Sequence, residues 1–294
     1  MSYKQLISLL AISLYCAAAQ AQSQRVMTAE KPIDSLNDDF TNSKTLAGWH
    51  QWHITEGQPD KWKTLSVQKG LLQLRPYASG WYGDYAASFM FKIVEGNFDV
   101  RTKIKVRGEK DGLPQTEWSL AGLMVRQPKR AGSVLEARSE NWLFLTTGIA
   151  EPKGSPVMEV KSTTNSISNL KLRPAREGWV ELRIVRVQAS FILLYRYEGE
   201  AWTVLERLYR PQLPYQLQVG INAYSGWNVI PGAVREDAAT HNKTVLTKVP
   251  TDMVVDVDYV HFARPTLNRE KLNTFFKTGF VAPYYTPGNV LTDY

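Results

Sequence analysis

The chain is almost free of cysteine, and this absence excludes several kinds of site. Cys16 is the only cysteine among 294 residues, and it lies in an apolar run, Leu6 to Ala19, that follows Lys4. The run is too short to cross a bilayer and leads to Ala19-Gln20-Ala21, a small-x-small pattern that signal peptidases accept. We expect residues 1–21 to be a signal peptide, which leaves a mature chain without disulfides, cysteine metal ligands or a cysteine nucleophile.

The compartment follows from the same segment. The alternative use of Cys16 is acylation as a lipoprotein anchor, but Tyr15 stands where a lipobox requires a small residue. A secreted chain of this size without disulfides fits a bacterial setting better than a eukaryotic one. We therefore expect a secreted or periplasmic bacterial protein that does not span the membrane, since no later segment is apolar for long enough.

Signatures of nucleotide and serine-hydrolase chemistry are also missing. The sequence has no P-loop, dinucleotide fingerprint, G-x-S-x-G elbow or EF-hand loop, which argues against nucleotide enzymes, serine hydrolases and cofactor-dependent oxidoreductases. The net charge is +7, but the basic residues are spread out. Arg101, Lys103 and Lys105 alternate with other residues, as on the solvated face of a strand, so we expect no nucleic-acid partner. Attraction to an acidic polysaccharide remains open.

Short alternating segments bounded by turn residues are abundant. In the stretch from Gly178 to Leu208, the run Val180 to Arg183 alternates apolar and charged residues, which predicts a strand with one buried and one solvated face. Two further strands follow across Gln188-Ala189-Ser190 and Glu198-Gly199-Glu200. Such a meander cannot bury its apolar face alone and requires a second sheet.

The remaining segments extend this pattern along the chain. We predict a hairpin with Lys69-Gly70 at its turn and another strand pair joined by Glu95-Gly96-Asn97. Roughly a dozen short strands with turns between them indicate an all-β fold, an antiparallel two-sheet jelly-roll sandwich with little helix. We expect an irregular lead-in at 22–37, one sandwich domain at 38–265 with an insertion at 227–252 over one edge or the mouth, and a tail at 266–294.

Several short motifs then stand in a characteristic order. They are Asp39-Phe40 with Trp49, Trp62 with Val67, Gly70 and Leu72, Ala121 to Arg126, Gly178 to Arg183, Glu198-Gly199 with Trp202, Gln218 to Ile221, and Val257 to Val260. In this order they resemble the LamG-like jelly rolls of the concanavalin A-like lectin/glucanase superfamily, and within that superfamily the DUF1349 group of extracellular bacterial proteins. Glu198 replaces the aspartate of that group's hairpin. The resemblance covers about residues 38–264 and implies the fold, with carbohydrate binding as the usual inference.

Aromatic side chains are the candidate ligand contacts. Jelly rolls commonly bind sugars through aromatics that stack on C–H faces, beside polar groups that bond hydroxyls, and the glycine-punctuated loop from Tyr77 to Tyr85 is the densest source. Core packing competes with this role for each residue. The predicted ligand-binding residues are Trp81, Tyr82, Asp84, Tyr85, Trp118, Arg126, Trp142, Tyr224 and Trp227. A glycan or polysaccharide is the expected partner.

Catalytic and metal sites are weakly supported by the sequence. Glycosidases need two carboxylates about 5–5.5 Å or about 6.5–9.5 Å apart, and the E-x-D-x-x-E pattern of laminarinase-type jelly rolls is absent, with Asp256-x-Asp258 as its nearest approach. We predict no catalytic residue, no metal site and no cofactor, apart from a structural calcium around Asp38 and Asp39 that this architecture often carries.

Three functions therefore remain open. The leading hypothesis is a non-catalytic, lectin-like carbohydrate-binding protein. The alternative is a carbohydrate-active enzyme, a glycoside hydrolase or polysaccharide lyase that uses acids such as Asp84, Glu117, Glu159 or Asp256. The third is a structural or adhesive envelope protein.

Overall fold

The computed structural model describes residues 30–110, 112–129 and 139–266. The expected signal peptide, most of the lead-in and the tail beyond residue 266 lie outside the described residues. Two seven-stranded sheets form the body, and every strand pair is antiparallel. The structure is a jelly-roll sandwich with few helices, which confirms the predicted fold class.

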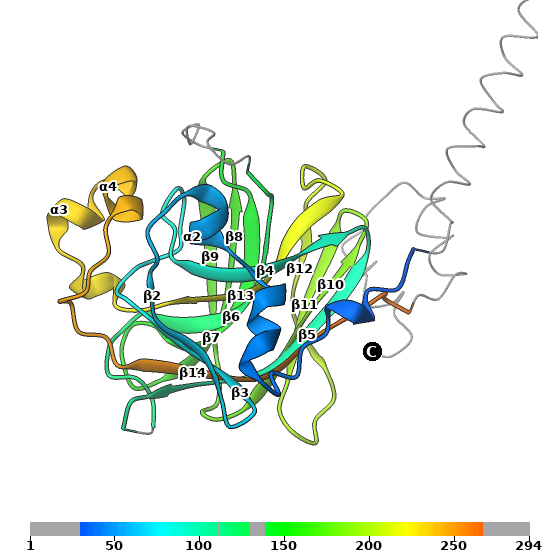
Figure 1. Ribbon diagram of the computed structural model, residues 1–294, viewed down its shortest axis with the longest axis horizontal. Helices are drawn as coiled ribbons and strands as arrows, with labels where there is room; N and C mark the ends of the chain where they lie inside the picture. Colours follow the sequence, from blue (N-terminus) through cyan, green and yellow to red (C-terminus); the bar gives the residue numbers. More distant parts are fainter. Residues whose placement is uncertain (1–29, 111, 130–138, 267–294) are drawn as a thin grey trace, which may run out of the picture. The chain divides into compact units, whose positions relative to one another are not determined.

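The two sheets are named here after a central strand (Figure 1). The β13 sheet runs β1 (His50–Gln51), β4 (Ser88–Glu95), β13 (Gln216–Tyr224), β6 (Ser119–Arg126), β7 (Trp142–Ile149), β8 (Pro156–Thr164) and β9 (Ile167–Pro174). The β14 sheet runs β12 (Thr203–Tyr209), β11 (Ser190–Arg196), β10 (Val180–Val187), β5 (Phe98–Gly108), β14 (Met253–Ala263), β3 (Leu71–Pro76) and β2 (Trp62–Gln68).

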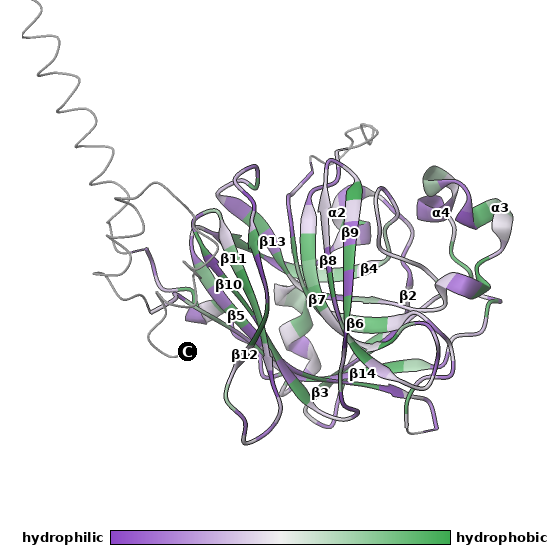
Figure 2. Cartoon of the chain, turned by 180° about the vertical axis from the view of Figure 1, so that it is seen from behind, coloured by the Kyte–Doolittle hydropathy of each residue, from purple (hydrophilic) through white to green (hydrophobic). Residues whose placement is uncertain are grey.

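The main core lies between the two sheets. Every second residue of a strand points inward, so Leu182 and Ile184 of β10 meet Leu123 of β6 and Ile221 of β13 in one apolar cluster. Figure 2 shows these apolar stretches in green along the strands, with polar segments in the connecting loops. Burying the inward faces removes apolar surface from water and stabilises the pairing of the sheets.

A second core covers the outer face of the β13 sheet. Helix α2 (Trp52–Glu56) contributes Trp52 and the loop before β4 contributes Trp81. The rings of both pack edge-on, at a centroid distance of 5.9 Å, and Trp81 lies 5.9 Å from Trp142 of β7. The outer face of this sheet is therefore filled by aromatic side chains of the protein itself.

The predicted meander and the Lys69-Gly70 hairpin are confirmed, but two details of the prediction are wrong. The strands around Glu95-Gly96-Asn97 do not pair, because β4 belongs to the β13 sheet and β5 to the β14 sheet. The outer face of β10 is not solvated throughout either. Arg183 is buried there and donates two hydrogen bonds of 3.0 and 2.5 Å to Asp99 on β5, because β10 is an interior strand with a carboxylate beside it.

The insertion packs against the loop of residues 77–87. It contains the turns η3 (Trp227–Val229), α3 (Gly232–Arg235) and α4 (Ala238–Lys243), seen at one side of Figure 1. Tyr85 donates its hydroxyl to the carbonyl of Arg235 at 2.9 Å, and Asn242 accepts from the amide of Ala86 at 2.8 Å. Two other short turns, η1 (Asp34–Leu36) and η2 (Ser43–Gly48), precede β1. Within the described ranges, no helix has the length and apolarity needed to cross a bilayer.

Candidate functional site

Four of the predicted ligand-binding residues are buried. Trp81 is 1% exposed, Arg126 and Trp142 are fully buried, and Tyr224 is 2% exposed. Trp81, Trp142 and Tyr224 belong to the outer core of the β13 sheet. In this conformation their rings contact the protein's own aromatics and present no face to a ligand, so for these residues core packing is what the structure shows.

Arg126 is the centre of a buried ion cluster. Its guanidinium donates to Glu140 at 3.1 and 3.0 Å, to Glu56 of α2 at 3.0 Å and to Gln218 of β13 at 2.9 Å. Burial acts to lower the pKa of Arg126, but the charges of Glu140 and Glu56 outweigh it and hold the pKa above its ordinary value. The cluster anchors α2 to the sheet and leaves Arg126 fully charged.

Glu159 lies in a second buried polar group on the same face. It accepts hydrogen bonds from the hydroxyls of Tyr224 and Thr146, and Lys161 lies 2.9 Å from its other oxygen. Burial and the neighbouring Glu159 charge raise the pKa of Tyr224 well above its usual range. Lys161 also donates to the carbonyl of Trp81 at 3.0 Å. The carboxylate of Glu159 is fully buried, and it is Lys161, its partner, that holds the covering loop through the carbonyl of Trp81.

Three of the four remaining predicted aromatics meet at the rim of the sandwich. Tyr82 and Tyr85 stack with ring centroids 4.4 Å apart, and Trp227 of η3 stands edge-on to both, at 4.9 and 5.3 Å. Tyr82 is 37% exposed, whereas Tyr85 and Trp227 are half-buried. We call Tyr82, Tyr85 and Trp227 the aromatic cluster. Asp84 lies in the same loop and accepts from the hydroxyl of Ser166.

A buried amine supports the aromatic cluster from below. Lys61, just before β2, donates to the carbonyls of Ala86 and His241 at 2.8 Å each, and its Nζ lies 3.3 Å from Nδ1 of His241. Burial lowers the pKa of Lys61 to about 7, and burial followed by the Lys61 charge lowers the pKa of His241 to about 3. His241 is therefore neutral above about pH 3, and its ring packs against Tyr85 and Trp227.

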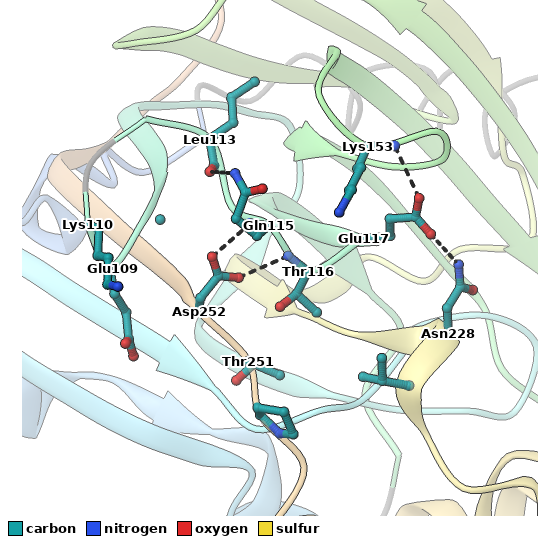
Figure 3. A pocket seen from close by; sticks show the side chains of 13 residues that line it. Glu109, Lys110, Leu113, Gln115, Thr116, Glu117, Lys153, Asn228, Thr251 and Asp252 are labelled. Carbon is teal, nitrogen blue, oxygen red and sulfur yellow. Dashed lines mark hydrogen bonds between the residues drawn. The ribbon is translucent and has the colours of Figure 1, made fainter.

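A cleft of about 740 Å³ opens next to η3. It lies between the loop from β5 to β6, the turn from β7 to β8 and the two ends of the insertion (Figure 3). Its polar lining includes Glu109, Gln115, Glu117, Lys153, Asn228 and Asp252. The volume is within the range of small-molecule sites. The same turn, η3, thus supplies Trp227 to the aromatic cluster and Asn228 to the cleft.

The carboxylates of the cleft join the loops around it. Asp252 accepts from the backbone amides of Gln115 and Thr116 at 2.7 and 3.0 Å. Glu117 accepts from the amide of Lys153 at 3.1 Å and from the side chain of Asn228 at 2.9 Å. Figure 3 shows these bonds spanning the cleft wall. All four carboxylate oxygens of this pair hold neighbouring segments, which fixes the shape of the cleft.

The sequence indicated this cleft only through Glu117. The cleft forms from three connections far apart in the chain, which carry no shared pattern. Trp118, a predicted ligand residue, is half-buried beside the cleft loops and donates to Glu151 at 3.4 Å. The other acids proposed for catalysis do not join Glu117, since Asp256 pairs with Arg107 at 2.6 Å on the β14 sheet.

No metal cluster occurs in the described part of the chain, where no group of three or more His, Cys, Asp or Glu side chains is arranged to hold an ion. Asp38 accepts from the amide of Phe40 and the indole of Trp49, each at 2.8 Å. Asp39 lies 2.6 Å from His261. Both acids have protein partners, and the structural calcium stays a prediction.

The fold and its rim define the class of the protein as a two-sheet jelly-roll sandwich, consistent with a concanavalin A-like fold. No protein-family model matches the sequence, and no curated protein matches it. Solved structures do match. One is a functionally unknown protein from Saccharomyces cerevisiae, with a TM-score of 0.50 and 14% identity over 75% of this chain and 98% of that one.

Two further matches are proteins from Bacillus. The xylan β-1,4-xylosidase of Bacillus halodurans C-125 has a TM-score of 0.52 and 16% identity, and covers 80% of this chain. The GH43 protein BlXynB of Bacillus licheniformis has a TM-score of 0.53 and 15% identity, and covers 81%. This chain spans 40% of the length of each. At these identities the likeness shows the fold alone.

Proposed function

We propose that this protein is a secreted or periplasmic jelly roll that binds a glycan without modifying it, and that the aromatic cluster is its contact surface. The observation that carries the proposal is the meeting of Tyr82, Tyr85 and Trp227 at the rim, from two segments about 140 residues apart in the sequence. Partly exposed rings offer apolar faces on which sugar C–H groups stack. The resemblance to the extracellular DUF1349 group supports the same assignment.

The cleft supplies the polar half of such a site. Asn228 follows Trp227 in the chain, and Lys153 lines the same cleft on another segment. Both side chains carry hydrogen-bond donors suited to sugar hydroxyls. A volume of about 740 Å³ accommodates a short oligosaccharide. We therefore expect shallow recognition of a few sugar units, with stacking at the cluster and hydrogen bonds in the cleft.

A glycan array with the purified protein, followed by calorimetry on the best ligand, tests this proposal. Tyr82→Ala removes an exposed stacking ring and should weaken binding roughly tenfold, since an aromatic contact contributes on the order of 1 kcal/mol. Tyr215→Ala is the matched control, because Tyr215 is 61% exposed in the loop before β13, outside the aromatic cluster. Its affinity should equal that of the wild type.

Two results would refute the proposal. Equal weakening in both variants would mean that Tyr82 has no special role. Absence of binding to every glycan would favour the structural or adhesive envelope protein.

A second candidate, a carbohydrate-active enzyme, is favoured by one feature of the cleft. Glu117 and Asp252 both line the same cavity, and Asp252 accepts a hydrogen bond from the amide of Thr116, the residue that precedes Glu117. Two nearby carboxylates are the requirement of glycoside hydrolysis. Release of reducing ends or unsaturated ends from a panel of polysaccharides, including xylan, should be measured. Activity that Glu117→Gln abolishes would establish the enzyme.

A further inference from the structure

The outer face of the β14 sheet carries a basic and aromatic surface on the opposite side of the sandwich from the outer aromatic core. Strand register places Arg196, Glu181, Lys103 and Tyr259 side by side on β11, β10, β5 and β14. Adjacent strands are about 4.8 Å apart, so this row crosses roughly 15 Å of the sheet. We call the surface around this row the basic face.

Cations and aromatic rings are in contact on the basic face. The guanidinium groups of Arg196, Arg183 and Arg101 lie 4.5, 5.3 and 5.8 Å from the ring of Trp202. Lys103 lies 5.6 Å from the ring of Trp179. A cation that lies over an aromatic face is attracted by the ring quadrupole and keeps its charge. The rings therefore hold these side chains as an ordered array of positive groups.

Carboxylates are interspersed but do not balance this array. Glu181 pairs with Arg196 at 2.5 Å, while Lys103 lies 3.6 Å from Asp258, too far for a hydrogen bond. The side chains of Lys103 and Asp258 are 33% and 42% exposed. Such exposed pairs are weak, and a polyanion can displace them. Lys105, on the same face of β5, lies opposite Asp256 in the strand register, and Asp256 itself pairs with Arg107 at 2.6 Å.

We propose that the basic face binds an anionic polysaccharide, one that carries carboxylate or sulfate groups on its sugars. Trp179, Trp202 and Tyr259 provide ring faces for the sugars, and the partly exposed side chains of Lys103, Lys105, Arg101 and Arg196 pair with the acid groups. Arg183 is buried against Asp99 and takes no direct part. The interspersed carboxylates accept hydrogen bonds from sugar hydroxyls. They disfavour nucleic acid, which carries a phosphate at about every 3.4 Å of helix axis along each strand, so that phosphates would meet Glu181 and Asp258 directly.

The test compares the full purified protein with a double variant, Lys103→Gln and Lys105→Gln. The probes are alginate for carboxylate groups, heparin for sulfate groups, xylan as a neutral chain and oligodeoxythymidylate as a nucleic acid. The wild type should bind alginate or heparin, more weakly as salt is raised. The double variant should bind roughly five- to tenfold more weakly, as expected for two exposed charge contacts.

The matched control is the pair Lys243→Gln and Lys248→Gln, which removes two exposed lysines of the insertion and changes the net charge equally. It should bind the anionic probe as the wild type does. Equal weakening in both double variants would mean that binding depends on net charge alone, and it would overturn the proposal. Tighter binding of the oligodeoxythymidylate than of alginate and heparin, or no binding of either polysaccharide, would also overturn it. Alginate against heparin decides which acid group is recognised.

Discussion

Trp81 and Tyr82 are neighbours in the chain but differ in what surrounds them. The Trp81 ring lies edge-on to Trp52, Phe89 and Trp142, at 5.9, 6.4 and 5.9 Å. Its position is central to the outer core, because it joins α2, β4 and β7. Tyr82 points to the rim, where stacking on Tyr85 leaves its other side to solvent.

We predict stability effects of very different size for the two residues. Trp81→Ala removes a fully packed ring and should lower the free energy of unfolding by about 3–5 kcal/mol. Tyr82→Ala should lower it by less than about 1 kcal/mol. Urea denaturation followed by circular dichroism measures both. A Trp81→Ala variant as stable as the wild type would contradict the packing described for the outer core.

The sequence identified this aromatic loop but could not assign its burial. The pattern YASGWYGDY shows that aromatics and glycines gather near a turn, which is typical of a rim loop. Whether Trp81 points inward depends on α2 and β7, which are distant in the chain and have no periodic relation to it. The same holds for Arg126, whose partners Glu56 and Glu140 lie on other segments. Tyr82, Tyr85 and Trp227 come together as a rim cluster, while their ligand remains a prediction.

Lys61, just before β2, connects this strand to two other segments, because its amine donates to the carbonyl of His241 in α4 and to that of Ala86 in the loop before β4. A neutral amine fits this place well. It donates to the carbonyls of Ala86 and His241, and its Nζ lies 3.3 Å from Nδ1 of His241. Its burial therefore makes the attachment of the insertion dependent on the charge of one lysine.

The pH dependence of stability follows from this lysine. Its pKa is about 7 in the folded chain, against 10.5 for an ordinary lysine. Between pH 7 and pH 10.5, Lys61 is protonated in the unfolded chain and neutral in the folded chain. The contribution of Lys61 to the free energy of unfolding therefore rises with pH. The slope is up to about 1.4 kcal/mol per pH unit, and the contribution is lost as pH falls from 10.5 to 7.

Lys61→Met should remove this slope and Lys243→Met should not, since Lys243 is exposed on α4. Urea denaturation of the three proteins between pH 7 and 10 gives the comparison. Loss of the Lys61 hydrogen bonds lowers the free energy of unfolding of Lys61→Met by a constant amount. The slope of this free energy against pH, and not its offset, is therefore diagnostic. Parallel curves for Lys61→Met and the wild type would refute a neutral buried amine.

The pairing of strands was likewise predictable for neighbours in the chain and not for strands that are distant in it. Alternation and turn residues correctly predicted the hairpin at Lys69-Gly70 and the meander of β10, β11 and β12. They failed at Glu95-Gly96-Asn97, because a short connection with glycine suits a hairpin, whereas here the two residues between β4 and β5 cross from one sheet to the other. β4 pairs with β13, about 120 residues later, and the two segments share no sequence signal beyond being strands.

The topology of the whole molecule makes the sandwich depend on its last described strand. β14 lies inside the β14 sheet, paired with β5 along Met253 to Ala263 and with β3 along Val255 to Val257. Without it, β3 and β2 lose their connection to the other four strands. Val257 and Val260 are also fully buried in the main core, so the core loses one wall when β14 is absent.

A chain ending at Asp252 should therefore fail to form the sandwich. We expect loss of the near-ultraviolet circular dichroism signal and of a cooperative urea transition, because interior-strand hydrogen bonds and the packing of the core disappear together. A synthetic peptide of residues 253–266, added in excess, should restore part of both signals by filling the gap between β5 and β3, while a peptide of the same composition in scrambled order should not. A cooperative transition in the truncated chain alone would mean that β5 and β3 pair directly, and would contradict the central place of β14.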